Sequence, residues 1–193
     1  SKDFSSVTIL HHLLNRKEAK LYNILPVSQN IMQSWQQQLR ITFKKSNKSA
    51  IVGIGNDIKA DDGIGPYIID HLQSLSPPNI ELINASTVPE NFITYLIDAN
   101  PSFILLIDAA LMQATPGTIR LIDKNSIGGI AFSSHQLPLN FFIEYIENSI
   151  TTTILILGIQ PFTNEFAQPL SEPVEAAAES IIETLTQIFR ELL

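Results

Sequence analysis

Short apolar runs along most of the chain alternate with segments whose apolar residues recur at helical spacing. One apolar run, Ala50–Gly55, ends in glycine and is typical of a buried parallel strand. Phe103–Ile107 is the most hydrophobic run, so it is predicted to be a central strand. The pattern predicts strands at 50–55, 80–83, 103–107, 118–122 and 153–157, and helices at 64–72, 89–98, 138–148 and 173–193.

Strands that alternate with helices predict an α/β fold with a mostly parallel sheet. We therefore expect a three-layer α/β/α sandwich, in which helices cover both faces of a twisted sheet. Thr118–Ile122 departs from the continuous apolar pattern because it alternates apolar and polar residues. This strand is predicted to lie at an edge of the sheet and to be antiparallel.

The first 48 residues have a different character. Two helices are predicted there, one with Val7, Leu10, Leu13 and Leu14 on one side, and one that starts near Ser28 and carries Ile31, Met32, Trp35, Leu39 and Phe43. We divide the chain into a basic helical N-terminal extension, residues 1–48, and an α/β domain, residues 49–193.

Charge supports this division. Residues 1–48 contain eight Lys or Arg and two acids, whereas residues 49–193 contain four Lys or Arg and seventeen acids. The basic extension is interpreted as a solvated face. Docking on the acidic body, or on an acidic partner, is the alternative.

The composition of the 193 residues, which have a net charge of -7, excludes several classes of protein. Because the chain has no cysteine, it has no disulfide framework and no thiol nucleophile. The acidic body argues against nucleic acid as a partner, since phosphate binding needs clustered Lys or Arg. The apolar runs are far shorter than the roughly 20 residues that span a bilayer, so no membrane insertion is expected. Since no secretory signal is visible at the start, we expect a cytoplasmic protein.

Three polar segments follow predicted strands, at the edge where parallel sheets bind ligands. They are Gly55–Pro66, Ile107–Ala110 and Ser133–Pro138. Two carboxylates and an imidazole from these segments, Asp62, Asp108 and His135, are the predicted site. Such a set could hold a divalent ion such as Ni²⁺ or Zn²⁺ and leave positions open for substrate.

Each of these residues also has a purely structural interpretation. Asp62 could cap the helix that follows it, Asp108 could satisfy a nearby helix start, and His135 could simply be hydrogen-bonded. Asn56 and Gln160, at two strand ends, could orient a peptide or hold turns.

The sequence does not match the motifs of dinucleotide-binding proteins, phosphate loops or serine hydrolases. Gly53-Ile54-Gly55 lacks the third glycine of the dinucleotide fingerprint, because Ile58 stands at that position. The chain has no Gly-Lys-Ser/Thr for a phosphate loop and no Gly-x-Ser-x-Gly elbow for a serine hydrolase.

Six phrases in order across residues 49–193 carry a specific resemblance. The first is Gly53-Ile54-Gly55-Asn56 with Asp61-Asp62-Gly63-Ile64-Gly65-Pro66. The others are Val88-Pro89-Glu90-Asn91, Leu106-Ile107-Asp108-Ala109, Pro116-Gly117-Thr118-Ile119, Ser134-His135-Gln136-Leu137-Pro138-Leu139-Asn140 and Leu157-Gly158-Ile159-Gln160-Pro161. In these phrases the chain resembles the [NiFe]-hydrogenase maturation endopeptidases, most closely the branch that processes the large subunit of hydrogenase 3.

The resemblance implies an activity, a partner and a site. Family members remove a C-terminal extension from the hydrogenase large-subunit precursor after nickel has been inserted. The partner would be this precursor, which supplies the nickel, and no permanently bound cofactor is expected. The family's metal-contacting acid, acid and histidine fall on Asp62, Asp108 and His135, which would be both the metal ligands and the catalytic residues.

The chain departs from the family pattern after the second strand. Asn84-Ala85-Ser86-Thr87 stands where an acidic residue followed by glycines is common, and Asn cannot supply a negative charge. The resemblance does not cover residues 1–48. The alternative function is a non-catalytic metal-sensing or chaperone module that binds nickel-loaded precursor without cutting it.

Overall fold

A computed structural model of the chain describes residues 27–75, 77–122, 124, 131–132 and 139–193. The chain divides into two compact units, Ser1–Gln37 and Gln38–Leu193. This division lies inside helix α2 (Val27–Lys45), which is the second of the two predicted N-terminal helices. The first predicted helix lies outside the described residues, and the predicted domain boundary after Lys48 stays a prediction.

The second unit contains the sheet and the helices that surround it. The strands are β1 (Ser49–Ile54), β2 (Ile80–Ser86), β3 (Phe103–Leu111), β4 (Ile119–Ile122), β5 (Ala131–Phe132) and β6 (Thr153–Ile159). The α-helices after α2 are α3 (Ile64–Leu72), α4 (Ile93–Ala99), α5 (Leu139–Ser149) and α6 (Glu172–Leu192). Three 3₁₀ turns, η1 (Ala60–Gly63), η2 (Gln73–Leu75) and η3 (Pro89–Phe92), adjoin α3 and α4.

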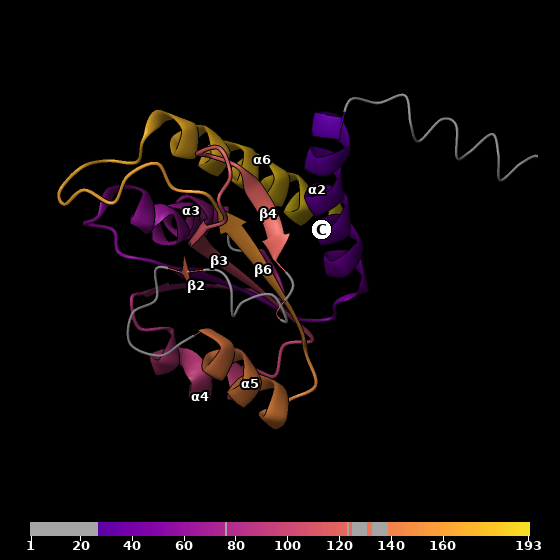
Figure 1. Cartoon of the computed structure of the whole chain (residues 1–193). Coiled ribbons are helices and arrows are strands. Elements are labelled where there is room, and N and C mark those ends of the chain that lie inside the picture. Colours follow the sequence, from indigo (N-terminus) through magenta and orange to yellow (C-terminus); the bar gives the residue numbers. More distant parts are fainter. Residues whose placement is uncertain (1–26, 76, 123, 125–130, 133–138) are drawn as a thin grey trace, which may run out of the picture. The chain divides into compact units, whose positions relative to one another are not determined.

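The strands run in the order β2-β1-β3-β6-β4, and β5 pairs with the end of β3. β1, β2, β3 and β6 are parallel, whereas β4 is antiparallel to β6 and β5 is antiparallel to β3. Helices α3 and α6 cover one face of the sheet, and α4 and α5 cover the other (Figure 1). The predicted α/β/α layers, the central position of β3 and the antiparallel edge strand β4 are confirmed.

Burial on both faces explains why the central strands are apolar without interruption. Alternate residues, among them Val52 and Leu106, join one buried cluster with Phe142 of α5. The residues between them face α3 and α6, and α3 lies directly on the strands. A Cβ atom added at Gly65 of α3 would lie 2.2 Å from the carbonyl oxygen of Ile54 and 2.6 Å from that of Ile107. This close approach brings η1, just before α3, to the carboxyl end of β3.

Three strands extend beyond their predicted ends. β3 continues through Asp108 because the backbone of Asp108 pairs with Gly158 of β6, and because Ala110 pairs with Phe132 of β5. β2 and β6 likewise continue through polar or glycine residues to Ser86 and Ile159. An apolar run shows which part of a strand is buried, but backbone pairing extends the strand beyond that run. The two-residue strand β5 has no pattern by which the sequence could predict it.

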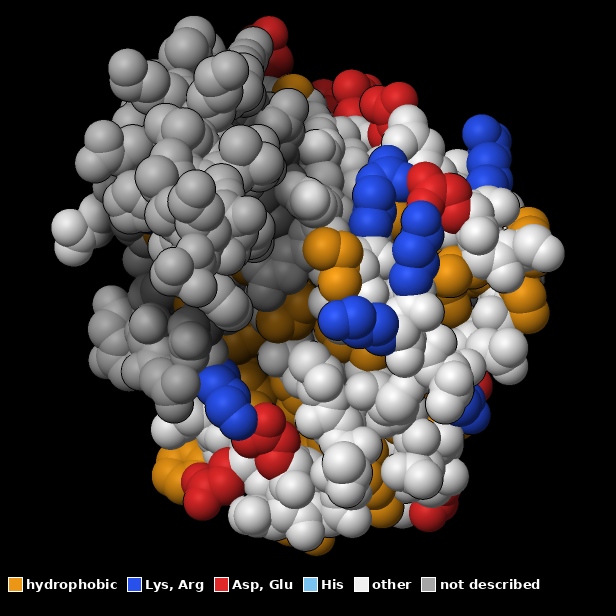
Figure 2. Space-filling model, turned by 90° about the vertical axis from the view of Figure 1, so that its right-hand side faces the viewer, with side chains coloured by type: hydrophobic (Ala, Val, Ile, Leu, Met, Phe, Trp, Pro, Cys, Tyr) orange, Lys and Arg blue, Asp and Glu red, His pale blue; other side chains and the backbone are white. Residues whose placement is uncertain are grey.

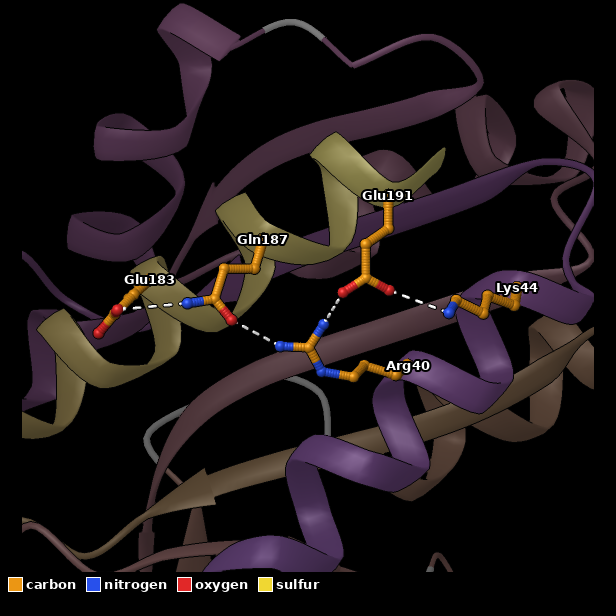
Figure 3. A network of polar contacts seen from close by, with 5 residues as sticks. All are labelled: Arg40, Lys44, Glu183, Gln187 and Glu191. Carbon is orange, nitrogen blue, oxygen red and sulfur yellow. Dashed lines mark hydrogen bonds and ion pairs between the residues drawn. The ribbon is translucent and has the colours of Figure 1, made fainter. Parts of the chain in front are cut away.

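The C-terminal part of α2 is attached to α6 by an ion-pair network (Figure 3). Arg40 forms an ion pair with Glu191 and donates to Gln187 Oε1 over 2.6 Å. Lys44 Nζ lies 3.0 Å from Glu191 Oε2. Beneath these contacts, the ring of Phe43 meets that of Phe103 edge-on, with centroids 4.9 Å apart. Two basic residues of the predicted extension therefore contact the acidic body.

This network predicts a small pH dependence of stability. The hydrogen bond from Lys44, followed by the charges of Arg40 and Lys44, lowers the pKa of Glu191. A carboxylate whose pKa is lowered by folding adds stability above its unfolded pKa and loses it as the pH falls through the folded pKa. In urea unfolding, Glu191→Gln is expected to be less stable than the wild type at pH 7, and this difference is expected to shrink as the pH falls below the unfolded pKa of Glu.

The matched control is Glu183→Gln, because Glu183 lies on the same helix but accepts a hydrogen bond from Gln187 rather than from a cation. The difference between Glu191→Gln and the wild type should also shrink in high salt, since both pairs are partly exposed. A Glu191→Gln difference that stays constant from pH 7 to pH 3 would contradict the assignment.

Elsewhere, too, positive side chains stand beside negative ones. Lys124 Nζ lies 2.6 Å from Glu147 Oε1, and Lys48 Nζ lies 3.4 Å from Glu81 Oε1. On the face drawn in Figure 2, Lys and Arg side chains are interspersed with acidic ones. Among the described residues, no helix is long and apolar enough to cross a bilayer.

Candidate active site

Asp62 and Asp108 come from different elements that meet at the carboxyl edge of the sheet. Asp62 lies in η1 and is 3 % exposed, and Asp108 lies in β3 and is 0 % exposed. η1 contacts β3, because Gly65 allows α3 to lie against the end of that strand. The structure thus places two of the three predicted site residues in neighbouring elements with buried side chains.

The turn between β1 and η1 fixes the position of Asp62. The chain folds back after Gly55, and the Asn56 amide donates to the Asp62 carbonyl oxygen over 3.1 Å. Gly55 has φ +140°, and a Cβ atom there would lie 1.9 Å from that same oxygen, so only glycine fits. Asn56 Oδ1 accepts from the Ile58 amide over 3.2 Å, which favours the turn-holding interpretation of Asn56.

Asp62 is not the residue that precedes α3. Because residues 60–63 form a 3₁₀ turn, the helix begins at Ile64 with Gly63 at the N-cap position. Asp62 therefore does not occupy the N-cap position of this helix.

His135 lies outside the described residues, so its place beside the two carboxylates stays a prediction. Among the described residues, no group of three potential His, Cys, Asp or Glu ligands is close enough to hold a metal ion. The last described residue before it, Phe132, pairs with Ala110, two residues beyond Asp108 in β3.

Asp61, next to the predicted ligand Asp62, has a structural role that the sequence did not reveal. Its carboxylate is fully buried and accepts four hydrogen bonds from the segment between β6 and α6. The donors are the amides of Phe162 at 2.7 Å, Thr163 at 2.9 Å and Ser171 at 2.7 Å, and the Ser171 hydroxyl at 2.8 Å. Asp61 therefore fixes the loop of residues 160–171 against the turn that carries Asp62.

Gln160 also holds loops together at this edge. Its Oε1 accepts from the amides of Met112 at 2.7 Å and Ala114 at 3.3 Å, and its Nε2 donates to the Pro161 carbonyl oxygen over 3.2 Å. The side chain is 7 % exposed. These contacts favour the structural interpretation of Gln160 over a role in orienting a peptide.

Asn84, at the position where the resemblance implies an acid, lies near the end of β2. Its Nδ2 donates to Asp70 Oδ1 over 3.0 Å, and its Oδ1 accepts from the Ser86 amide over 3.1 Å. Asp70 belongs to α3. Asn84 thus acts as a link between β2 and α3.

The family model described as hydrogenase maturation protease (HycI) matches residues 66–188. The chain belongs to this family. The matched span includes Asp108 and His135 and begins after Asp62. The family predicted from the six phrases is thereby confirmed.

Curated and solved relatives agree with this HycI-family assignment. The hydrogenase 3 maturation protease of Escherichia coli K12 is 32% identical over 133 residues, which cover 68% of this chain and 85% of that protein. The crystal structure of the [NiFe] hydrogenase maturation protease HycI from Thermococcus kodakarensis KOD1 is 27% identical, with a TM-score of 0.73, and covers 79% of this chain and 98% of that one. The solution structure of the endopeptidase HycI from Escherichia coli is 29% identical, with a TM-score of 0.63, and covers 70% of this chain and 87% of that one. The predicted class of enzyme, an endopeptidase, is confirmed.

Proposed function

We propose that this hydrogenase maturation protease removes a C-terminal extension from a [NiFe]-hydrogenase large-subunit precursor after the precursor has received nickel. Asp62, Asp108 and His135 would contact the nickel that the substrate carries. The chain would need no cofactor of its own, because the ion arrives with the precursor.

The observation that carries the proposal is the placement of two buried carboxylates from separate elements at one edge of the sheet. Asp62 is held there by the backbone bonds of the turn after β1, and Asp108 by the pairing of β3 with β6. A negative charge withdrawn from water attracts a cation more strongly than an exposed one does. Carboxylate oxygen and imidazole nitrogen are donors that suit a divalent first-row ion.

His135 is within reach of this edge along the chain. It follows Phe132 by three residues, and three residues span at most about 11 Å. Phe132 is itself paired with Ala110, on the strand that carries Asp108. The covalent tether is thus compatible with a shared ion.

The chemistry is the hydrolysis of one peptide bond, in which water adds to the scissile carbonyl and the new amine takes a proton. Asp62 and Asp108 would hold the precursor through its nickel, so that the scissile carbonyl stays in one position. A bound divalent ion can also polarise a carbonyl or activate water. Fixing the reacting groups relative to each other accounts for a large part of many rate enhancements.

The test uses purified chain and purified large-subunit precursor, with and without inserted nickel. The expected result is that mass spectrometry shows loss of a C-terminal fragment from the nickel-loaded precursor alone. Equal cleavage of the nickel-free precursor would contradict nickel dependence. Stable binding of the loaded precursor without any change in its mass would favour the metal-sensing or chaperone module instead.

A further inference from the structure

Three large apolar side chains are exposed on the two loops that Asp61 joins. Phe162 is 69 % exposed and Phe166 is 67 % exposed, both on the loop between β6 and α6, and Ile58 on the β1–η1 turn is 50 % exposed. Figure 1 shows the loop between β6 and α6 beside α3. We call these three residues the Phe162 patch.

The loops that carry this patch are fixed to each other by hydrogen bonds. The Ala167 amide donates to the Ile58 carbonyl oxygen over 2.8 Å, which ties the chain next to Phe166 to the turn. The Asp61 amide donates to the Thr163 carbonyl oxygen over 3.2 Å, and the Asp61 carboxylate accepts from the Phe162 amide. The backbone of the patch is thus set before any partner binds, which lowers the entropy lost on association.

We propose that the Phe162 patch docks an apolar surface of the large-subunit precursor beside the bond that is cut. This inference rests on the proposed function, and it is supported by the position of the Phe162 patch. Asp61 accepts hydrogen bonds from the loop that carries Phe162 and is followed directly by Asp62. This loop therefore borders the turn that supplies a proposed nickel contact. An endopeptidase must hold a protein substrate next to its reacting groups, and exposed aromatic rings are common anchors of protein interfaces.

The charge around the patch indicates the character of the precursor surface. Asp57 and Glu165, each next to a residue of the patch, are exposed, and Lys59, on the other side of Ile58, is partly buried. Residues 49–193 as a whole contain seventeen acids and four Lys or Arg. An apolar surface with a basic rim is therefore the complementary partner, since opposite potentials favour encounter and orientation.

The experiment measures precursor cleavage by the double variant F162S/F166S over a range of precursor concentrations. The expected result is a fall in kcat/KM of at least about tenfold, carried by KM rather than by kcat, because lost anchors weaken binding more than chemistry. The matched control is Tyr145→Ser, which removes another exposed ring, 58 % exposed, from α5. Tyr145→Ser should cleave with the kcat/KM of the wild type. Ile58→Ser, on the other loop, should also raise KM.

The possible outcomes test the docking role of the Phe162 patch and the proposed function separately. If the wild type cleaves the precursor and F162S/F166S has an unchanged KM, the patch assignment is wrong while the function stands. If the wild type does not cleave at all, the function fails, and equal binding of precursor by wild type and F162S/F166S overturns the patch as well. A wild-type dimer that becomes monomeric in F162S/F166S, with KM unchanged, would identify a second copy as the occupant. Unfolding midpoints of the variants equal to that of the wild type ensure that a raised KM reflects docking.

Discussion

Replacing Asp108 or Asp62 by Asn should lower the rate of precursor cleavage by about 100- to 1000-fold. The amide keeps the size of the side chain and one oxygen, but it cannot offer a negative charge to a divalent ion. Losing a preorganised charged group at a reacting centre has an effect of this order. The measurement is single-turnover cleavage of nickel-loaded precursor, followed by mass.

The matched control is Asp98→Asn, which removes one exposed carboxylate from α4, away from the carboxyl edge that holds the site. This variant should cleave at the wild-type rate. Far-ultraviolet circular dichroism and urea unfolding establish that Asp62→Asn and Asp108→Asn fold. A folded Asp108→Asn protein with wild-type activity would show that this carboxylate does not contact the nickel. His135→Ala tests the third predicted contact in the same assay.

The architecture could be predicted because a buried sheet leaves a simple trace in the sequence. Strands covered by helices on both faces must be apolar throughout, so Phe103–Ile107 indicated a central strand. Alternation in Thr118–Ile122 indicated the edge, where one face meets water. The ends of β2, β3 and β6 were predicted too early. In β3 and β6, Asp108 and Gly158 pair through their backbones whatever their side chains are.

The roles of the acidic residues at the edge were harder to predict. Asp61 and Asp62 are adjacent and of one type, and nothing local separates a structural carboxylate from a candidate ligand. The difference lies in partners far along the chain, since Asp61 accepts from Phe162, Thr163 and Ser171. Periodicity and spacing report local structure, whereas contacts across about a hundred residues appear only in the folded chain. The roles of Asp62 and Asp108 rest on the resemblance and on their placement.

Asp61→Ala should lower the free energy of unfolding by about 3–5 kcal/mol, because it removes the acceptor of three backbone amides and one hydroxyl. Leaving a buried donor without an acceptor costs about 1–3 kcal/mol, and the partial exposure of the loop keeps the sum near the lower end. The measurement is urea unfolding at pH 7. Ser171→Ala is the graded control, since it removes only the hydroxyl donor and should cost about 1 kcal/mol.

Asp61→Ala also tests whether the stability of this loop affects docking of the precursor. If Asp61 fixes the loop that carries Phe162, Asp61→Ala should also raise the KM for precursor, because the Phe162 patch must then be ordered at the moment of binding. Asp62→Asn, one residue away, leaves the hydrogen bonds between Asp61 and the loop in place. It should therefore slow cleavage without releasing the loop that carries Phe162. An Asp61→Ala protein that unfolds at the wild-type urea concentration would show that the four hydrogen bonds do not hold this edge together. Such a result would remove the physical basis for a preformed docking surface beside Asp62.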